Sequence, residues 1–179
     1  MAENNTVQIV DEEIKMLDEE FIVSKTDLRG YITYANRTFM EIGLYSEEQL
    51  LGINHNIIRH PDMPKGVFKL IWMTIKKGQE FFGYVKNLRS DGRYYWVFAN
   101  ITAEYDGNGK LSGYFSVRRK PPVSAVNTIE PIYQQMLKIE HSASNDKLAE
   151  QKSLAFLQQQ LKNLNVEYQD FVINLFNEK

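Results

Sequence analysis

Residues 81–119 read FFGYVKNLRSDGRYYWVFANITAEYDGNGKLSGYFSVRR. Three runs rich in aromatic and β-branched residues are separated by Ser90-Asp91-Gly92 and by Asp106-Gly107-Asn108-Gly109. Aromatic and β-branched side chains favour strands, whereas Asp, Asn and Gly favour the tight turns of hairpins. The stretch therefore predicts three consecutive antiparallel strands at residues 81–89, 93–104 and 110–119.

The preceding residues predict two more strands and a set of short helices. Residues 21–24 and 31–35 are β-rich runs on either side of the turn-forming stretch 26–30, so we expect them to form a hairpin. Helices are expected where a capping signal precedes apolar residues at helical intervals. These helices are residues 37–42 after Asn36 with Gly43 at the end, a helix from the capping box of Ser46 and Gln49 to Gly52, and residues 64–77 between Pro64 and Gly78.

This order of elements predicts an α+β fold. Five antiparallel strands would form one sheet, and the short helices would cover one of its faces. A small chamber between the helices and the sheet would be the natural place for a ligand. Pro121 and Pro122 end the last strand, because neither can donate a ladder hydrogen bond. We therefore divide the chain into an acidic N-terminal segment (1–20), the α+β domain (21–120) and a C-terminal extension (121–179).

The C-terminal extension is predicted to be helical and amphipathic. Apolar residues recur at alternating spacings of three and four in two sets, which are Ile129, Ile132, Met136, Ile139 and Ala143, and then Leu154, Leu157, Leu161, Leu164, Tyr168, Phe171 and Leu175. Because the two sets are out of phase, residues 141–146 are either the turn of a helical hairpin or part of one continuous helix. The helices could pack back on their own sheet. The regular stripe, with residues 158–160 and Lys162 opposite it, instead favours a coiled coil with another helix, and hence a homo-oligomer or a partner protein.

Composition and charge distribution exclude several classes of function. The chain of 179 residues has no cysteine, which rules out disulfides, Cys-ligated metals, a thiolate nucleophile and a flavin–cysteine adduct. The net charge of -2 separates into -6 for residues 1–20, +6 for residues 21–120 and -2 for residues 121–179. The basic centre suits either a solvated surface or an anionic ligand such as a phosphate-bearing cofactor, while scattered bases and acidic flanks argue against nucleic acid. No apolar run is long enough to span a membrane, so we expect a cytoplasmic protein without membrane insertion.

The sequence resembles a known family. The order of elements, the strand start GRYYWV at residues 92–97 and the DGNG turn resemble a PAS sensor domain. A more specific set of motifs resembles the FAD-binding PAS domain of the bacterial aerotaxis receptor. It consists of residues 55–65 (HNIIRHPDMPK), Trp72, Lys76-Lys77-Gly78 and Val85-Lys86-Asn87. The resemblance covers about residues 20–120.

The resemblance implies a noncovalently bound FAD whose redox state follows respiration and is passed to the chemotaxis machinery. We expect the protein to differ from that receptor in having neither a membrane anchor nor a methyl-accepting signalling domain. It is therefore similar to the bipartite energy-taxis systems, in which a soluble PAS protein controls a separately encoded membrane chemoreceptor. That partner could recruit the protein to the inner face of the membrane, and the C-terminal extension would contact it.

The resemblance also implies a set of cofactor-binding residues, which are Asn36, His55, Arg59, His60, Asp62, Trp72, Asn87 and Arg118. From its chemistry alone, Arg59 can bind a phosphate or pair with Asp62. Either histidine can donate to the flavin, or it can lie solvated or act as a cap. Trp72 can form a stacking wall or part of the core, and Asn36 can cap a helix or contact the flavin.

Asn87 and Arg118 suggest how the site would respond to redox state. Asn87 interrupts an apolar strand, where a buried amide needs a partner, and the light-sensing flavin PAS relatives have an asparagine at the matching position. Their second asparagine and their glutamine are matched here by Val97 and Arg118, and their reactive cysteine is missing. We therefore expect thermal redox chemistry, with the change in charge felt by Asn87, Arg118 or a histidine. The motifs provide no catalytic acid pair and no nucleophile with a base, so we expect no enzyme activity.

Three other functions remain open from the sequence. A haem-binding PAS gas sensor would use His55 or His60 as its axial ligand. In a cofactor-free interaction module, aromatic residues would fill the chamber, namely Trp72, Phe81, Phe82 and Tyr84. An enzyme that acts on flavin would need a nicotinamide-binding glycine motif, which the sequence lacks.

Overall fold

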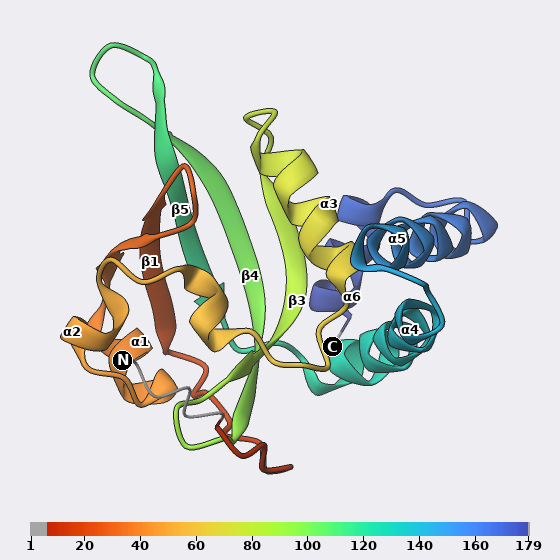
Figure 1. Ribbon diagram of the computed structural model, residues 1–179, viewed down its shortest axis with the longest axis horizontal. Coiled ribbons are helices and arrows are strands. Elements are labelled where there is room, and N and C mark those ends of the chain that lie inside the picture. The colour runs from red at the N-terminus through yellow and green to blue at the C-terminus, as the bar shows by residue number, and fades with distance from the viewer. Residues whose placement is uncertain (1–6, 179) are drawn as a thin grey trace.

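The computed structural model describes residues 7–178, and its elements follow the predicted order (Figure 1). The strands are β1 (Phe21–Asp27), β2 (Ile32–Ala35), β3 (Phe81–Leu88), β4 (Tyr94–Tyr105) and β5 (Leu111–Arg119). The helices are α1 (Arg37–Gly43), α2 (Glu47–Leu50), the 3-10 helix η1 (His55–Ile58), α3 (Lys65–Ile75), α4 (Val123–His141), α5 (Asp146–Asn163) and α6 (Tyr168–Asn177). Residues 1–6 of the predicted acidic segment lie outside the described residues.

All five strands form one antiparallel sheet in the order β2-β1-β5-β4-β3. Because side chains alternate across a sheet, the pairing register determines which residues share a face. Ser24 on β1 lies opposite Ser116 on β5, and Ala99 on β4 lies opposite Arg118 on β5. The helices α1, α2, η1 and α3 cover the face that carries these residues (Figure 1). The predicted α+β fold with a five-stranded antiparallel sheet is confirmed.

The predicted capping residues form the starts of the short helices. Asn36 Oδ1 accepts a hydrogen bond from the Phe39 backbone N–H at 3.1 Å, which caps α1. Ser46 and Gln49 form the reciprocal capping box that begins α2. Such caps satisfy backbone N–H groups that the first helical turn leaves unpaired. The local sequence therefore determines where α1 and α2 begin.

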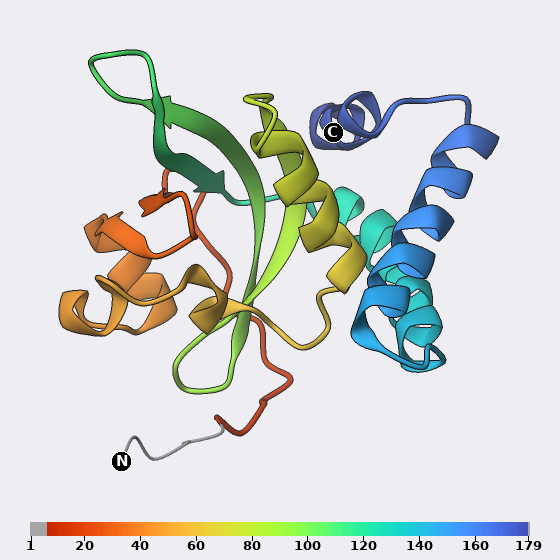
Figure 2. The ribbon, with the colours of Figure 1, turned by 45° about the horizontal axis from the view of Figure 1, so that its top comes forward.

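The C-terminal extension folds back on the same domain as three helices. The chain turns between α4 and α5, so the helical hairpin is the alternative found in the structure. α4 packs against α5, α5 against α3, and α6 against β3 (Figures 1 and 2). In the part of the chain that the structure describes, no helix is both long enough and apolar enough to cross a lipid bilayer.

The apolar stripe of the extension is buried within the chain. It is interrupted between α5 and α6, where Leu164 is 61% exposed. The buried members of the two predicted sets are Ile129, Met136, Leu154, Leu157, Leu161 and Leu175. The buried part of the stripe therefore packs within the chain, as in the alternative in which the helices pack back on their own domain. Apolar periodicity identifies the face of a helix that is buried, but it does not identify the surface that covers it.

Helices α4 and α6 pack along β3 and on the face of the sheet opposite the cavity. The Tyr133 hydroxyl donates to the Tyr84 carbonyl oxygen at 2.9 Å, and the Tyr84 hydroxyl donates to the Val172 carbonyl oxygen at 3.0 Å. The rings of Trp96 and Tyr133 stack with centroids 6.3 Å apart. An uncovered edge strand would present a row of unpaired backbone groups. The extension is thus part of the folded domain.

Glu140 on α4 joins the extension to the start of α3. Its Oε1 accepts hydrogen bonds from Gly66 N at 3.0 Å and from Ser153 Oγ at 2.5 Å. Pro64, at the N-cap position of α3, offers no side-chain cap, so the Glu140 carboxylate satisfies a free N–H of the first turn instead. α5 lies so close to Gly66 that an added Cβ would be 2.3 Å from Ser153 Oγ and 2.7 Å from Leu154 N.

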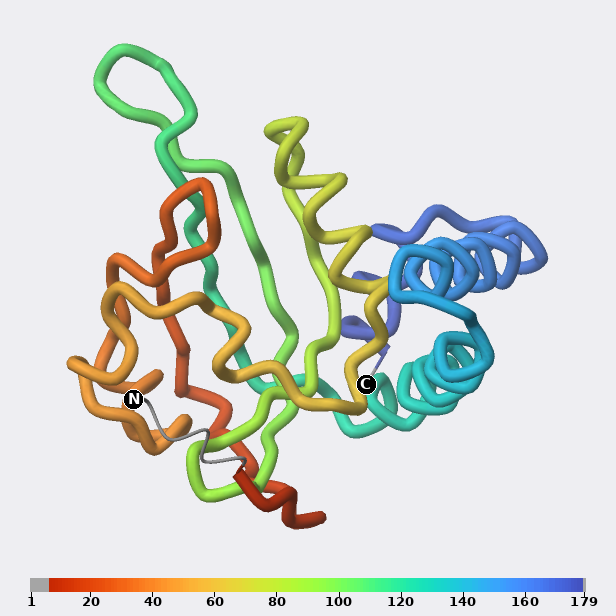
Figure 3. Tube along the Cα trace, in the orientation of Figure 1, coloured from red at the N-terminus to blue at the C-terminus, as the bar shows by residue number. Residues whose placement is uncertain are grey.

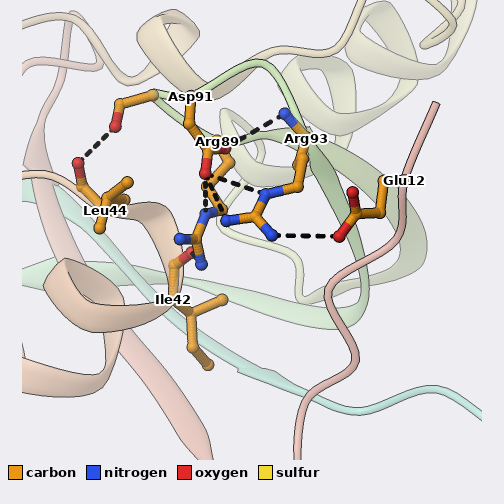
Figure 4. A network of polar contacts seen from close by, with 7 residues as sticks. Glu12, Ile42, Leu44, Arg89, Asp91 and Arg93 are labelled. Atoms are coloured by element: carbon orange, nitrogen blue, oxygen red, sulfur yellow. Dashed lines mark hydrogen bonds and ion pairs between the residues drawn. The ribbon is translucent and has the colours of Figure 1, made fainter. Parts of the chain in front are cut away.

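The N-terminal segment lies against the β3–β4 turn (Figure 3). Arg93 pairs with Asp91 through Nη2 at 2.7 Å and with Glu12 through Nη1 at 3.1 Å (Figure 4). Arg89 Nε also contacts Asp91, at 3.1 Å. The acidic segment is therefore held to this turn by the Glu12–Arg93 ion pair and by backbone hydrogen bonds such as that from Val10 N to Gly92 O, away from the cavity described below.

Replacing Gly66 by Ala should destabilise the protein. In an exposed helix the change would stabilise by about 1 kcal/mol, but the clash with α5 should reverse the sign and cost roughly 1–3 kcal/mol. Urea unfolding of Gly66→Ala and of Gly107→Ala tests this, because the Cβ position at Gly107 meets no atom within 4 Å. Equal stability of the two variants would contradict the packing of α5 on α3.

Candidate ligand-binding site

A cavity of about 410 Å³ lies between the sheet and the helices η1 and α3. This volume is within the range of roughly 300–1,000 Å³ of small-molecule pockets. The wall is mainly apolar and aromatic, formed by Ile58, Phe68, Ile71, Trp72, Ile75, Val85, Ala99, Ile101 and Tyr114. The polar lining residues form a largely buried group, Ser24, His55, Asn87, Ser116 and Arg118, and a more exposed group, Thr26, Arg29, Asn54, Asn56 and Arg59.

Arg118 is a buried cation in the wall of this cavity, with only 5% of the residue exposed. Its Nη2 donates to His55 Nε2 at 2.8 Å and to Ser24 Oγ at 3.1 Å. Burial lowers the pKa of Arg118 to about 10, so the guanidinium is still charged at neutral pH. No carboxylate within residues 7–178 forms an ion pair with it. Burying a charge without a counter-ion is costly, so this position calls for a partner.

His55 orients Arg118 and is itself neutral. Because His55 Nε2 accepts from the guanidinium, the imidazole proton must lie on Nδ1. Burial and the neighbouring charge of Arg118 lower the pKa of His55 to about 3. The Phe39 ring stacks on the imidazole with centroids 5.7 Å apart. His55 therefore acts as a fixed acceptor for Arg118 and does not carry charge into the cavity.

Three buried polar atoms in the lining have no hydrogen-bond partner within residues 7–178: Asn87 Nδ2, Ser116 Oγ and Arg118 Nη1. An unpaired buried polar group costs about 1–3 kcal/mol, and native structures contain few of them. All three atoms can donate a hydrogen bond. The arrangement fits a ligand that presents several acceptor atoms to this side of the cavity.

Arg59 and Trp72 line the more exposed part of the cavity. The Arg59 guanidinium lies 4.1 Å from the centroid of the Phe68 ring, and Nη2 donates to the Met63 carbonyl oxygen at 3.2 Å. Burial lowers the pKa of Arg59. The alternative ion pair of Arg59 with Asp62 is not formed, because Asp62 pairs elsewhere. Arg59 thus keeps N–H groups available at the cavity.

The sequence model of the PAS fold family matches residues 32–118, which contain most of the cavity lining. Residues 32–118 form a PAS domain. The aerotaxis receptor of Escherichia coli strain K12 is 42% identical over 121 residues, which are 68% of this chain and 24% of that protein. The predicted resemblance of this PAS domain to the aerotaxis receptor is therefore confirmed.

Other proteins also resemble this PAS domain. The nitrogen fixation regulatory protein of Klebsiella pneumoniae is 33% identical over 102 residues, or 57% of this chain and 21% of that protein. The structure of the light state of the blue-light photoreceptor Aureochrome1 LOV superposes with a TM-score of 0.52 at 25% identity, covering 68% of this chain and 93% of that one. The chain spans about a quarter of the length of the curated relatives named here, 24% and 21%.

Five predicted site residues of the PAS domain meet at the cavity, and three do not. The five are His55, Arg59, Trp72, Asn87 and Arg118. The side chain of Asn36 instead bonds the backbone of β1 and caps α1. His60 and Asp62 join Lys86, whose Nζ lies 2.7 Å from Asp62 Oδ2 and 3.8 Å from Glu130 Oε1 on α4. His60 Nδ1 accepts from the Asp62 N–H at 3.1 Å.

Sequence reasoning missed Ser24 and Ser116, which face each other across β1 and β5 inside the PAS domain. The alternation of side chains along a strand could have identified Ser116. Ser116 precedes Arg118 by two positions, so both side chains point to the same face of the sheet. A serine at an inward position of a buried strand is a candidate ligand contact for the same reason as Asn87.

The lowered pKa of His55 predicts that the free energy of unfolding decreases as the pH is lowered. Between its folded pKa of about 3 and the ordinary value of 6.5, the unfolded chain binds more protons than the folded chain. The contribution is therefore complete above pH 6.5 and decreases below it by up to about 1.4 kcal/mol per pH unit. Urea unfolding at pH 7.5, 6.0 and 5.0 should show a shallower dependence in His55→Gln than in the wild type. His141→Gln, at an exposed position, should match the wild type, and equal slopes in all three proteins would contradict this assignment.

Proposed function

We propose that this PAS protein binds FAD noncovalently in the cavity and signals the redox state of the flavin to a chemotaxis transducer. The supporting observation is the set of unpaired donors, Asn87 Nδ2, Ser116 Oγ and Arg118 Nη1, in an apolar and aromatic cavity. A flavin ring has a flat apolar body and an edge of carbonyl oxygens and ring nitrogens that accept hydrogen bonds. The donors and the wall fit that chemistry. The similarity to the Escherichia coli aerotaxis receptor supports the signalling role.

The residues of the cavity would hold the flavin and respond to its charge. When bound, a flavin supplies reversible uptake of electrons and protons. Arg118 would stabilise added negative charge, because its own charge has no protein counter-ion. His55 would keep the guanidinium in place while remaining neutral. Asn87 can donate through its amide nitrogen or, after rotation of the amide, accept through its oxygen.

A chain of contacts leads from Asn87 towards the C-terminal helices. Arg59 forms an isolated antiparallel bridge with Asn87, so the loop after η1 is tied to β3. The same loop carries Asp62, which pairs with Lys86, and Lys86 lies near Glu130 on α4. A changed hydrogen bond at Asn87 would shift this loop and the position of α4. We place the output of the sensor on the surface of the C-terminal extension, in contact with a membrane transducer on the cytoplasmic side.

Photoadduct chemistry is not part of this proposal. The sequence has no cysteine, so the similarity in fold to a blue-light photoreceptor does not extend to a thiol that could react with the ring. The cavity groups bind a ligand and hold charge, which suits signalling and not turnover.

Haem and cofactor-free readings fit the geometry less well. A haem needs a free imidazole nitrogen, but His55 Nε2 accepts from Arg118 and His60 lies outside the cavity lining. Tyr84, one of the aromatic residues expected to fill the chamber, points to the other side, where its hydroxyl bonds Val172 of α6. The cavity thus keeps its volume.

The absorption spectrum of the protein purified from a flavin-sufficient host tests the proposal. We expect the two-peaked spectrum of an oxidised flavin, and the ligand released on denaturation should be FAD by chromatography. A Soret band would instead establish haem. A colourless protein that stays colourless after incubation with FAD would favour the cofactor-free module.

A pair of asparagine variants tests the assigned site. Asn87→Ala should weaken flavin binding about 3- to 10-fold, since it removes one buried hydrogen bond. Asn100→Ala is the matched control on β4, because Asn100 bonds Glu80 and does not line the cavity. Isothermal titration of the flavin-free proteins measures both affinities. Equal affinities of the two variants would place the ligand elsewhere.

A further inference from the structure

Leu44, at the end of α1, has a backbone conformation that is unusual for its residue type. Its φ of 56° and ψ of 44° lie in the left-handed region, and among residues 7–178 the non-glycine residues with positive φ are Leu44 and Asn165. Glycine usually takes this position at the end of a helix, and asparagine tolerates it, whereas a bulky side chain is strained there. Gly43, the predicted end of α1, stays helical, so the strained position falls on a leucine.

Contacts on both sides of Leu44 hold this conformation. The Tyr45 N–H donates to the Met40 carbonyl oxygen at 3.1 Å, and the Ser90 N–H donates to the Gly43 carbonyl oxygen at 3.0 Å. The Ser90 hydroxyl donates to the carbonyl oxygen of Leu44, which therefore lies beside the β3–β4 turn (Figure 4). Leu44 is nevertheless 49% exposed, so the strain is not offset by full burial of the side chain in the core. A strained residue whose side chain remains accessible is a candidate contact for another molecule.

Two further apolar side chains are exposed on the other side of the same turn. The Val10 N–H donates to the Gly92 carbonyl oxygen at 2.8 Å, and a Cβ added at Gly92 would lie 3.4 Å from Val10 Cγ2. Ile9 and Val10 are both exposed. We call Ile9, Val10 and Leu44 the turn patch. None of the three lines the cavity.

The unpaired charges next to the turn patch are negative. Arg89 and Arg93, the arginines of the turn, are already paired with carboxylates (Figure 4). Asp11 follows the patch residue at position 10 directly, and Glu47 and Glu48 begin α2 a few residues after position 44. All three acids are exposed, and none forms an ion pair within residues 7–178. An apolar patch with free acidic groups beside it complements an apolar surface that carries basic groups.

We propose that the turn patch binds a basic amphipathic segment of a partner protein, with an apolar side chain against Leu44 and lysine or arginine beside the acidic groups. The charge disfavours other occupants. Nucleic acid would be repelled, and a second copy of this chain would bring acidic groups against acidic groups. Residues 1–6, MAENNT, contain neither lysine nor arginine, so they lack the complementary charge. This surface is additional to the output surface on the C-terminal extension, and it does not depend on the ligand of the cavity.

A pair of substitutions at position 44 separates strain from contact. Leu44→Gly and Leu44→Ala both remove the apolar side chain and should both weaken partner binding. Leu44→Gly should unfold at a higher urea concentration than Leu44→Ala, because only glycine relieves the left-handed strain. Equal urea midpoints of the two variants would contradict the strain at this position and overturn the inference.

Fluorescence anisotropy with a labelled synthetic helix tests the binding itself. The probe has leucines on one face and lysines on the other, and its matched control has glutamates in place of the lysines. We expect the wild type to bind the leucine–lysine helix at least about 10-fold more tightly than the leucine–glutamate helix. Leu44→Ala and Glu47→Gln/Glu48→Gln should each weaken the binding of the leucine–lysine helix about 3- to 10-fold.

Matched control variants lie on the C-terminal extension. Leu164→Ala removes another exposed leucine, and Glu167→Gln/Asp170→Asn removes two other exposed acidic groups. Both should bind the leucine–lysine helix like the wild type. A loss in these controls equal to that in the turn-patch variants, or larger, would overturn the inference.

The remaining outcomes identify other occupants of the turn patch. Equal binding of the two synthetic helices by the wild type, or no binding of either, would overturn the proposed partner chemistry. Size-exclusion chromatography with light scattering measures the oligomeric state. A wild-type dimer that Leu44→Ala dissociates would assign the patch to a second copy of this chain and overturn the partner assignment. Tighter binding of the leucine–lysine helix after deletion of residues 1–6 would assign the patch to that segment instead.

Discussion

The uncompensated guanidinium of Arg118 is the constraint on which the rest of the site depends. A buried cation normally pairs with a carboxylate, and here its protein partners are a neutral imidazole and a serine hydroxyl. The lowered pKa values of Arg118 and His55 share one cause, which is burial of both groups in the same small space. Holding this charge in place costs stability. A ligand that brings acceptor atoms or negative charge to Arg118 Nη1 would recover part of that cost.

The surrounding fold keeps the guanidinium dry and oriented. β5 carries Arg118, β1 carries Ser24, and the loop into η1 carries His55, so three separate segments converge on one group. Helix α3 closes the cavity on the opposite side, and its first turn is fixed by Glu140 from α4. The C-terminal helices are therefore joined to the helix that closes the cavity, although none of their residues lines the cavity. A sensor needs such a connection, because a change in the cavity has to alter a surface that a partner can contact.

The sequence predicted the sheet, the caps and the chamber because these depend on local rules. Hairpin turns at residues 90–92 and 106–109, and caps such as Asn36, act over a few residues and can be identified from the chain alone. The surface against which the C-terminal helices pack could not be predicted in this way. The spacing of Leu154, Leu157 and Leu161 shows only that one face is buried, and the β3 edge that needs covering is known only once the sheet has formed.

The same distinction between local and long-range determinants applies to the residues of the candidate site. Asn87 was identifiable because a polar group in an apolar strand needs a partner, and Ser116 could have been found by the same rule. Arg118 was identified through the resemblance, which matches it to a glutamine of the light-sensing relatives. His60 and Asp62 stand in the same motif as Arg59, but the loop turns them towards Lys86 and away from the cavity. The side chains of these sequence neighbours point in different directions, because a loop without regular structure has no fixed repeat in side-chain direction. The direction of each side chain is then set by contacts that are distant in the chain.

The midpoint potential of the flavin that we propose as the ligand tests the role of Arg118 most directly. Arg118→Gln removes the buried charge, and Arg119→Gln removes the neighbouring charge, which is exposed and lies over Phe21 and Phe176 on the other face of the sheet. If Arg118 stabilises the negative charge gained on reduction, Arg118→Gln should shift the potential by about 60 mV or more in the negative direction for a one-electron step. Arg119→Gln should leave the potential near that of the wild type. An unchanged potential in Arg118→Gln would contradict the assignment of the buried guanidinium as the charge that senses reduction.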